Sequence, residues 1–299
     1  MRRFVTALTF FFLLFPSSTA FLQDAGSGSP REILERSWAS APSEALPLLE
    51  RTLPVSGDLR PYYLVELARQ AALAKKWKES VRWSETAAEI PEDIADSRAF
   101  WHGYALEASG KADSALPVYR KRLETGLARD SSLYLAFFRI SSGDAEGMTA
   151  RLDAALPNLS KTDPETYALS RYLGGLCAVR GGNWDFAVTA FSAFAGAREG
   201  RFPEYAPWAA FYRGWGLYRL GRWDQALKYL TEYLDSWPNH ERSWQAAVAS
   251  ALSAILAGRD PLPFTDRAVR LAPDSGALAE SLLLRATVLV DRRDFAAAE

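Results

Sequence analysis

The fold of this protein is decided by residues 207–240, which read PWAAFYRGWGLYRLGRWDQALKYLTEYLDSWPNH. Apolar residues recur every three or four positions over 208–220 and again over 223–234, a spacing that predicts two amphipathic helices. A Gly-Arg turn separates the two helices. Small residues, Gly214 in the first helix and Ala226 in the second, allow the helices to approach closely. The stretch therefore predicts a tightly packed helical hairpin.

The same pattern recurs along the chain at a nearly constant interval. A residue equivalent to Ala226 falls near positions 45, 80, 115, 150, 187, 226, 261 and 298, in steps of 35 to 39 residues. Two of these units repeat both small residues: Gly175 pairs with Ala187, and Gly103 pairs with Ala115. One helical hairpin cannot bury its apolar stripe alone, so neighbouring hairpins are expected to stack.

These features resemble the tetratricopeptide repeat, a 34-residue helix–turn–helix unit. The resemblance rests on the small residues, on the turn glycine Gly221, on the aromatic Trp223 and on the closing Pro238. It implies an all-α fold, a right-handed α-solenoid superhelix of stacked antiparallel helix pairs. It covers residues 30–299 as about eight pairs, the last incomplete, and is weakest over 130–156, where a distorted repeat or a hinge is expected. Sel1-like or other α-solenoid repeats are the alternative.

The N-terminus has the pattern of a secretory signal peptide. The chain begins with Met-Arg-Arg and an apolar run over 4–15, and small residues follow at Ser18 and Ala20. As a helix this run spans about 18 Å, which is shorter than the membrane hydrocarbon core of about 30 Å. We therefore expect residues 1–20 to be removed on export to the bacterial periplasm or cell envelope, and residues 21–29 to form a short flexible linker. An uncleaved anchor or a buried helix is the alternative.

The composition excludes several classes of function. Lys and Arg total 35 against 36 acidic residues, so the chain lacks the positive charge of a non-specific nucleic-acid binder. Two histidines and one cysteine cannot form a multi-histidine or zinc-cysteine site, and neither a phosphate-binding glycine-rich loop nor a Gly-x-Ser-x-Gly motif is present. The acidic cluster over 89–96 is expected to cap a helix, and Cys177 to be buried. We expect no cofactor, no metal and no enzymatic activity.

The resemblance also implies a binding surface, because the first helix of each pair lines a concave groove in the resembled family. In this chain the groove positions are occupied mainly by aromatic and arginine side chains. They are Tyr62, Arg69, Phe100, Tyr104, Tyr172, Arg180, Trp208, Phe211, Trp215, Tyr218 and Arg219. Such a surface suits an extended peptide, or a sugar ring stacked on an aromatic face. The alternative is that some of these rings only fill the core between repeats.

Two functions are consistent with these features. The first is a non-enzymatic scaffold of the periplasm or cell envelope that grips a partner protein or peptide, with peptidoglycan as an alternative ligand. The second is the non-catalytic superhelical region of a larger cell-wall enzyme, a layout that resembles the soluble lytic murein transglycosylases. Residues 294–299 look like the start of a second helix, so we expect the natural chain to continue beyond Glu299.

Overall fold

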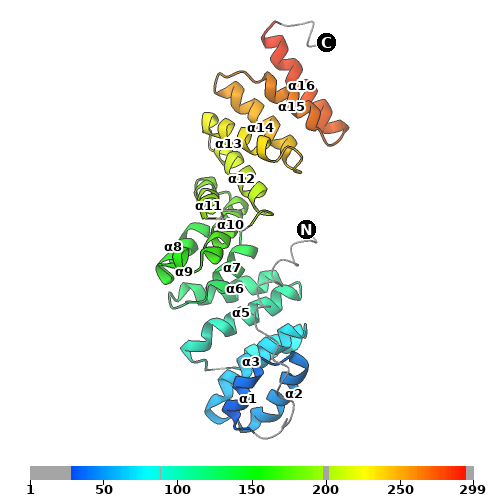
Figure 1. The fold of residues 1–299 in the computed structure, drawn as a ribbon. Helices are drawn as coiled ribbons and strands as arrows, with labels where there is room; N and C mark the ends of the chain where they lie inside the picture. Colours follow the sequence, from blue (N-terminus) through cyan, green and yellow to red (C-terminus); the bar gives the residue numbers. More distant parts are fainter. Residues whose placement is uncertain (1–27, 88, 198–201, 294–299) are drawn as a thin grey trace. The chain divides into compact units, whose positions relative to one another are not determined.

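The computed structural model describes residues 28–87, 89–197 and 202–293, and every regular element in these ranges is helical (Figure 1). The all-α fold predicted from helical periodicity is therefore confirmed. The signal peptide predicted at 1–20 lies outside the described residues, as does the predicted helix start at 294–299. Within the described ranges, no helix is both long enough and apolar enough to cross a membrane.

The chain divides into two compact units, residues 1–118 and 119–299. The helices of unit 1 are α1 (Pro30–Ser37), α2 (Pro42–Thr52), α3 (Arg60–Leu73), α4 (Trp77–Thr86) and α5 (Glu92–Ala108), with short 3-10 turns at Leu53–Val55 and Gly57–Leu59. Helix α6 (Ala112–Glu124) runs across the division. The remaining helices of unit 2 are α7 (Ser131–Ile140), α8 (Ala145–Ala155), α9 (Leu159–Thr162), α10 (Pro164–Gly181), α11 (Trp184–Ala197), α12 (Ala206–Arg219), α13 (Trp223–Ser236), α14 (Ser243–Leu256), α15 (Leu262–Leu271) and α16 (Ser275–Asp291).

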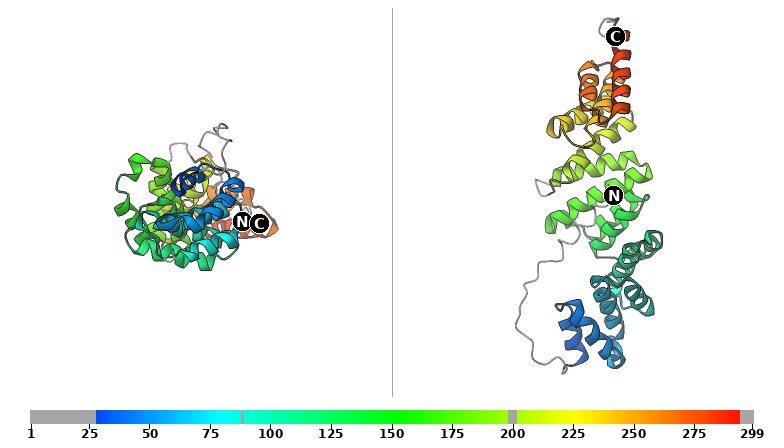
Figure 2. Two further views of the ribbon diagram at one scale, coloured as in Figure 1. Left: turned by 90° about the horizontal axis from the view of Figure 1, so that it is seen from below. Right: turned by 90° about the vertical axis from the view of Figure 1, so that its right-hand side faces the viewer.

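Within each unit, helices that follow one another in the sequence pack against one another. In unit 2 this holds for each successive pair from α10 to α16, and the right-hand view of Figure 2 shows these helices as stacked layers. In unit 1, α3 packs against α2, α4 and α5. Stacked helix pairs are the architecture that the repeat pattern predicts.

The small residues of the repeat lie where two helices of a pair approach most closely. A Cβ atom added at Gly214 of α12 would lie 2.8 Å from Leu230 Cδ2 of α13. A Cβ atom added at Gly175 of α10 would lie 2.8 Å from the ring of Phe191 in α11. Both distances are too short for a real Cβ contact, so only glycine fits without rearrangement. Gly214 and Gly175 therefore lie at the close approaches where the predicted register expects small residues.

The turn glycines have the backbone conformation that ends a helix. Gly182 and Gly221 have φ values of +77° and +72°, in the left-handed region that side chains other than glycine rarely adopt. After Gly221, the N–H of Arg222 donates to the carbonyl of Leu217 at 3.0 Å, which satisfies a carbonyl at the end of α12. Each glycine lets the chain reverse direction and begin the second helix of its pair.

The region with the weakest repeat pattern, residues 130–156, also forms two helices. These are α7 and α8, and the one-turn helix α9 is inserted before α10, which packs against all three. A Cβ atom at Gly181, the last residue of α10, would lie 2.3 Å from the carbonyl oxygen of Ser142 in the α7–α8 turn. The repeat is distorted by the insertion of α9 and by this backbone-to-backbone approach.

Exposed ion pairs connect successive repeats of unit 2 along one edge. Arg222 pairs with Asp185 at 2.8 Å, Arg259 pairs with Asp224 at 3.3 Å, and Arg292 pairs with Asp260. In each pair the arginine belongs to the later repeat. All of these side chains are at least 40% exposed, so each pair adds little to stability.

Candidate functional site

Five aromatic residues of α12 form a continuous set of rings, which we call the α12 aromatic cluster: Trp208, Phe211, Tyr212, Trp215 and Tyr218. Spacings of three and four residues place them on one side of the helix. Trp208 stacks on Tyr212 with ring centroids 6.2 Å apart, and Trp215 lies 5.7 Å from Phe211 and 5.5 Å from Tyr218. The cluster is thus an ordered surface held together by ring–ring contacts.

The members of this cluster differ in exposure. Phe211 is only 4% exposed and belongs to the core of unit 2. Trp208, Tyr212, Trp215 and Tyr218 are half-buried, so each presents one edge or face to solvent. Next to them Arg219 is exposed, with its guanidinium carbon 5.3 Å from the ring centroid of Trp184. The exposed part of the cluster is therefore aromatic with a cationic margin.

Three rings predicted to line the groove lie in the core instead. Phe100, Tyr172 and Phe211 are 8%, 2% and 4% exposed. Tyr172 stacks on Tyr205 with ring centroids 4.7 Å apart, and its burial raises the pKa of its hydroxyl well above the usual value. The prediction that these three side chains contact a partner is corrected on this point, because no partner atom could reach them.

Two arginines predicted to face the groove bind the ends of neighbouring helices. Arg69 forms a 2.7 Å ion pair with the buried Glu66, and its Nη2 also lies within hydrogen-bond distance of the Ser37 carbonyl at the end of α1. Arg180 donates from Nε to the carbonyl of Ser141 at 2.9 Å and from Nη2 to that of Phe138, both at the end of α7. Carbonyls at a helix C-terminus have no partner within the helix and favour cations, so both arginines stabilise helix ends.

The remaining predicted residues of unit 1 are half-buried. The Tyr62 hydroxyl donates to the Asp93 carboxylate at 3.0 Å, and Tyr104 packs in a ring cluster with Trp77 and Phe100. Asp93 belongs to the acidic cluster of residues 89–96 and lies with Glu92 in the first turn of α5, where a negative charge suits the helix dipole. The expected side-chain cap is not seen, because the N-cap residue is Pro91. These contacts are structural within unit 1.

Sequence reasoning missed two side chains that border Trp208. The ring of His240 lies 4.9 Å from the Trp208 ring in an edge-on arrangement, and Arg242 lies 5.5 Å above the same ring. His240 Nδ1 lies 2.6 Å from the Tyr233 hydroxyl, and burial lowers the pKa of the imidazole. The Pro238 turn brings residues 240–242 back to α12. The closing proline was therefore the sequence signal that could have predicted the contact of these residues with Trp208.

The titratable groups do not form a metal-binding arrangement in the described part of the chain. No group of three or more His, Cys, Asp or Glu side chains there is placed to hold a metal ion. Cys177 is buried, as predicted, and its burial raises the pKa of the thiol, which disfavours the reactive thiolate. Burial lowers the pKa of the His102 imidazole, which favours its neutral form.

The comparisons with known proteins agree with this architecture. The tetratricopeptide repeat family model matches residues 208–240, so the stretch that contains the α12 aromatic cluster is similar to a tetratricopeptide repeat. The crystal structure of apo RapI superposes with a TM-score of 0.52 at 12% identity, covering 89% of this chain and 88% of RapI. That likeness shows a shared fold of stacked helix pairs.

Two other solved structures are similar at lower TM-scores. A signal transduction ATPase with a tetratricopeptide repeat sensor from Pyrococcus horikoshii gives a TM-score of 0.47 at 15% identity. The match covers 89% of this chain but only 45% of that chain. The TPR2AB-domain:pHSP90 complex of yeast Sti1 gives a TM-score of 0.33 at 15% identity, covering 87% of this chain and 96% of that chain. No curated protein matches this sequence.

Proposed function

We propose that this protein is a non-enzymatic scaffold that binds a protein or peptide partner on the exposed side of the α12 aromatic cluster. The observation that carries the proposal is the half-exposed set of Trp208, Tyr212, Trp215 and Tyr218 on one face of a repeat similar to the tetratricopeptide repeat, beside the exposed Arg219. Tryptophan, tyrosine and arginine are the residues that most often dominate binding energy at protein interfaces.

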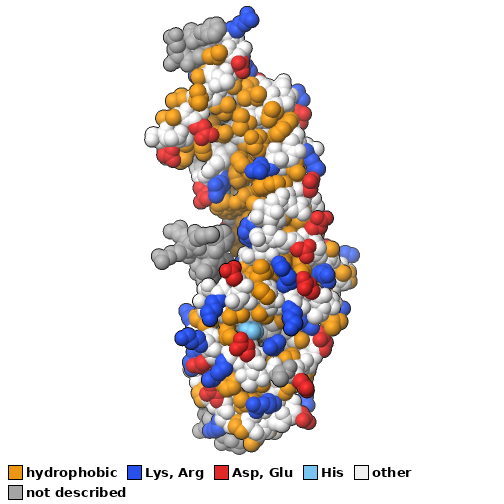
Figure 3. All heavy atoms as spheres, turned by 180° about the vertical axis from the view of Figure 1, so that it is seen from behind, with side chains coloured by type: hydrophobic (Ala, Val, Ile, Leu, Met, Phe, Trp, Pro, Cys, Tyr) orange, Lys and Arg blue, Asp and Glu red, His pale blue; other side chains and the backbone are white. Residues whose placement is uncertain are grey.

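The rigidity of this surface favours binding. Its rings are already fixed by neighbours: Tyr212 stacks on Phe191 of α11, and Tyr218 packs against Trp223 of α13. Binding to rings that are already held in place costs less conformational entropy than binding that must first order flexible side chains. Apolar side chains also gather at the level of α12–α16 on the face shown in Figure 3. Apart from that view, the large hydrophobic side chains exposed in α14 and α16 are Ile255, Leu256, Leu278, Leu282, Leu283 and Val290.

The binding proposal is tested by cross-linking and by mutation. A photo-reactive phenylalanine analogue at position 218 should cross-link the partner in cells. The double substitution Trp208→Ala with Trp215→Ala should lower the cross-linking yield about tenfold. This is the effect of removing one or two dominant interface side chains. Helix content by circular dichroism should stay near normal, since both side chains are already partly exposed.

The matched control places the same analogue at Lys228, which is exposed on α13. That position should give no cross-link that depends on Trp208 or Trp215. An unchanged yield in the double variant would contradict the proposal, and a loss of helix content would show that the two rings are structural.

We further propose that the protein is exported to the bacterial periplasm or cell envelope. The support is the N-terminal sequence, in which two arginines precede the apolar run over 4–15 and small residues at Ser18 and Ala20. Expression of the full chain in a bacterium should yield a product whose mass, measured by mass spectrometry, is that of a chain starting at residue 21. A product of full mass that stays in the cytoplasmic fraction would contradict export.

A further inference from the structure

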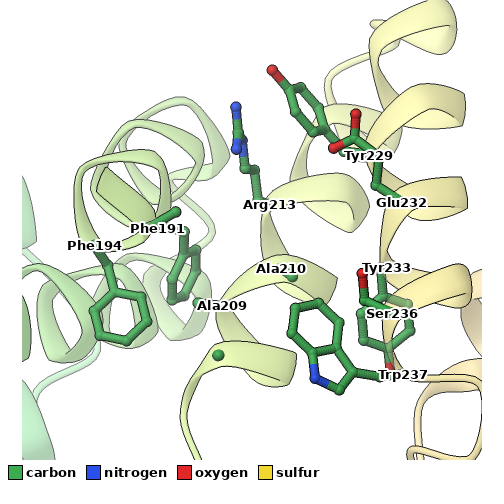
Figure 4. Close-up of a pocket in the computed structure, with 12 residues that line it drawn as sticks. Phe191, Phe194, Ala209, Ala210, Arg213, Tyr229, Glu232, Tyr233, Ser236 and Trp237 are labelled. Atoms are coloured by element: carbon green, nitrogen blue, oxygen red, sulfur yellow. The ribbon is translucent and has the colours of Figure 1, made fainter. Parts of the chain in front are cut away.

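The side of α12 that carries the aromatic cluster is the side accessible to a partner. Its opposite side faces α11 and α13, where Ala209, Ala210 and Arg213 border a pocket of about 190 Å³ (Figure 4). The aromatic walls of that pocket, Phe191 and Phe194, are 0% exposed, so a partner side chain cannot pack on them. On α12, a partner therefore contacts the half-exposed rings of the cluster.

The exposed side of the cluster offers hydrogen-bond donors. The indole N–H groups of Trp208 and Trp215 and the hydroxyls of Tyr212 and Tyr218 form no hydrogen bond to another described residue. These four polar atoms are not buried either, so each is accessible to a ligand. An indole N–H can only donate. A partner that covers the cluster must therefore supply acceptors, because a donor buried without an acceptor costs free energy.

The charges of this surface favour neutral acceptors. Helix α12 contains no Asp or Glu, so it offers no carboxylate to the N–H groups of a peptide or to the hydroxyls of a sugar. Arg219 is exposed at one margin of the cluster, while Arg242, which lies over Trp208, is already paired with Glu241 at 3.9 Å. A surface rich in donors and free of carboxylates is complementary in charge to the negative ends of carbonyl groups.

A polyproline II helix is the peptide conformation that supplies such carbonyls. It has no internal hydrogen bonds, so its carbonyl groups are free to accept. Proline has no N–H, so a proline-rich segment brings no donor that needs an acceptor from α12. An α-helical partner bonds its own carbonyls internally and would leave the indole N–H groups unpaired. Every regular element in the described residues is helical, so they offer no sheet edge to which a peptide strand could add.

The spacing of the rings matches the repeat of this conformation. Trp208 and Trp215 lie about 10 Å apart along the α12 axis, and Tyr212 and Tyr218 lie about 9 Å apart along it. In a polyproline II helix, residues i and i+3 share one face and are about 9 Å apart. A peptide that runs along α12 therefore places residues i and i+3 over two rings of the same type.

Building on the function proposed above, we propose that the α12 aromatic cluster binds a proline-rich segment in the polyproline II conformation. Prolines at positions i and i+3 of the segment pack on the rings of Trp208 and Trp215. Carbonyl groups between them accept hydrogen bonds from the two indole N–H groups. The partner is thus defined by its proline spacing and by its backbone carbonyls rather than by a charged side chain.

The tryptophan indole signals of the full chain test this proposal by NMR. With nitrogen-15 in the indole rings, the signals of Trp208 and Trp215 are assigned from the Trp208→Phe and Trp215→Phe variants. Titration with acetyl-heptaproline-amide should shift both signals saturably. A Gly-Ser peptide of the same length should shift neither, because it is a flexible coil without proline rings. Unshifted signals of both tryptophans with heptaproline would overturn the proposal.

Two further peptides test the spacing. Pro-Ala-Ala-Pro-Ala-Ala-Pro carries prolines at intervals of three, whereas Pro-Ala-Pro-Ala-Pro-Ala-Pro carries more prolines but none at i and i+3. The first should bind about fivefold more tightly, since only the first places successive prolines on one face and so covers a second indole ring. Equal affinity, or tighter binding of the second peptide, would contradict the match between the ring spacing and the peptide repeat.

Conservative variants test the donated hydrogen bonds. Trp208→Phe and Trp215→Phe each keep a ring but remove an N–H, and each should weaken heptaproline binding about fivefold, the effect of one lost hydrogen bond. The control is Trp38→Phe, which changes a side chain of unit 1 that is 60% exposed and should leave the affinity unchanged. The other indole signals should stay in place in each variant, which shows that the fold is retained. Unchanged affinity in both Trp208→Phe and Trp215→Phe would overturn the proposal.

The outcomes separate this inference from the function on which it rests. Chitopentaose and an amphipathic helical peptide should leave the two indole signals in place, and a saturable shift with either of them but not with heptaproline would overturn the proline-rich ligand. In that case the cross-link at position 218 would still depend on Trp208 and Trp215. Loss of that dependence in cells would instead contradict the proposed binding function itself.

Discussion

Replacing Gly214 with leucine is expected to lower the free energy of unfolding by about 3 kcal/mol, at the upper end of the usual cost of overpacking. Even the Cβ of the new side chain would lie 2.8 Å from both Cγ and Cδ2 of Leu230, and 3.2 Å from the backbone nitrogen of that residue. Leu230 is fully buried and cannot move outward, so the two helices of the pair must separate. Urea denaturation followed by circular dichroism measures the change.

Gly196→Leu is the matched control for this substitution. Gly196 lies in α11 and is exposed, and an added Cβ would meet nothing within 4 Å. Leucine favours the helix more than glycine does, so this variant should be unchanged or more stable by up to about 1 kcal/mol. Similar losses in the two variants would mean that Gly214 has no special packing role and that the repeat register is wrong.

The helix-pair architecture was predictable because its signals are local in sequence. The close approach of Gly214 to Leu230 involves residues 16 positions apart within one hairpin, and Gly221 is a turn glycine within the same hairpin. Sequence spacing reports such features directly, since small residues and turn glycines are required wherever two helices pair tightly. The same reasoning predicted that Cys177 is buried, and this was confirmed.

Exposure of the predicted binding residues was less predictable. Phe211 and Trp215 are one helical turn apart, yet Phe211 is buried against Tyr233 of α13 while Trp215 stays half-exposed. The two positions are alike in sequence pattern, and their difference depends on which neighbouring helix covers each ring. Burial of a ring between repeats is a property of the stacked neighbours rather than of its own helix.

The contacts of the predicted groove arginines were also difficult to predict from the sequence. Arg69 and Arg180 bind backbone carbonyls at the ends of earlier helices, and a backbone carbonyl has no residue-type signal in the sequence. Arg219 occupies a similar predicted position but remains exposed beside Trp184. A substitution at Arg69 should therefore affect stability rather than partner binding.

Replacing Glu66 with alanine is expected to destabilise unit 1 by about 3 kcal/mol, because breaking a buried ion pair leaves the remaining charge without compensation. Its carboxylate accepts hydrogen bonds from Arg69 Nε at 2.8 Å and Nη2 at 2.7 Å, and from Gln70 Nε2 at 2.9 Å. Glu66 is only 5% exposed, so water cannot replace it as the acceptor. Because Arg69 and Gln70 also reach the Ser37 carbonyl, the loss should loosen the contact between α1 and α3.

Glu35→Ala is the control, since it removes an exposed ion pair with Arg31 whose side chains are 52% and 80% exposed. Exposed pairs of this kind contribute only about 0.5 kcal/mol. Hydrogen exchange should show faster exchange of the α1 and α3 amides in Glu66→Ala but not in Glu35→Ala, and a Glu66→Gln variant should fall between them because it keeps an acceptor but loses the charge. Equal stability of the Glu66→Ala and Glu35→Ala variants would show that the buried network does not hold α1 on α3. Arg69 would then be available for the binding role that its groove position predicts.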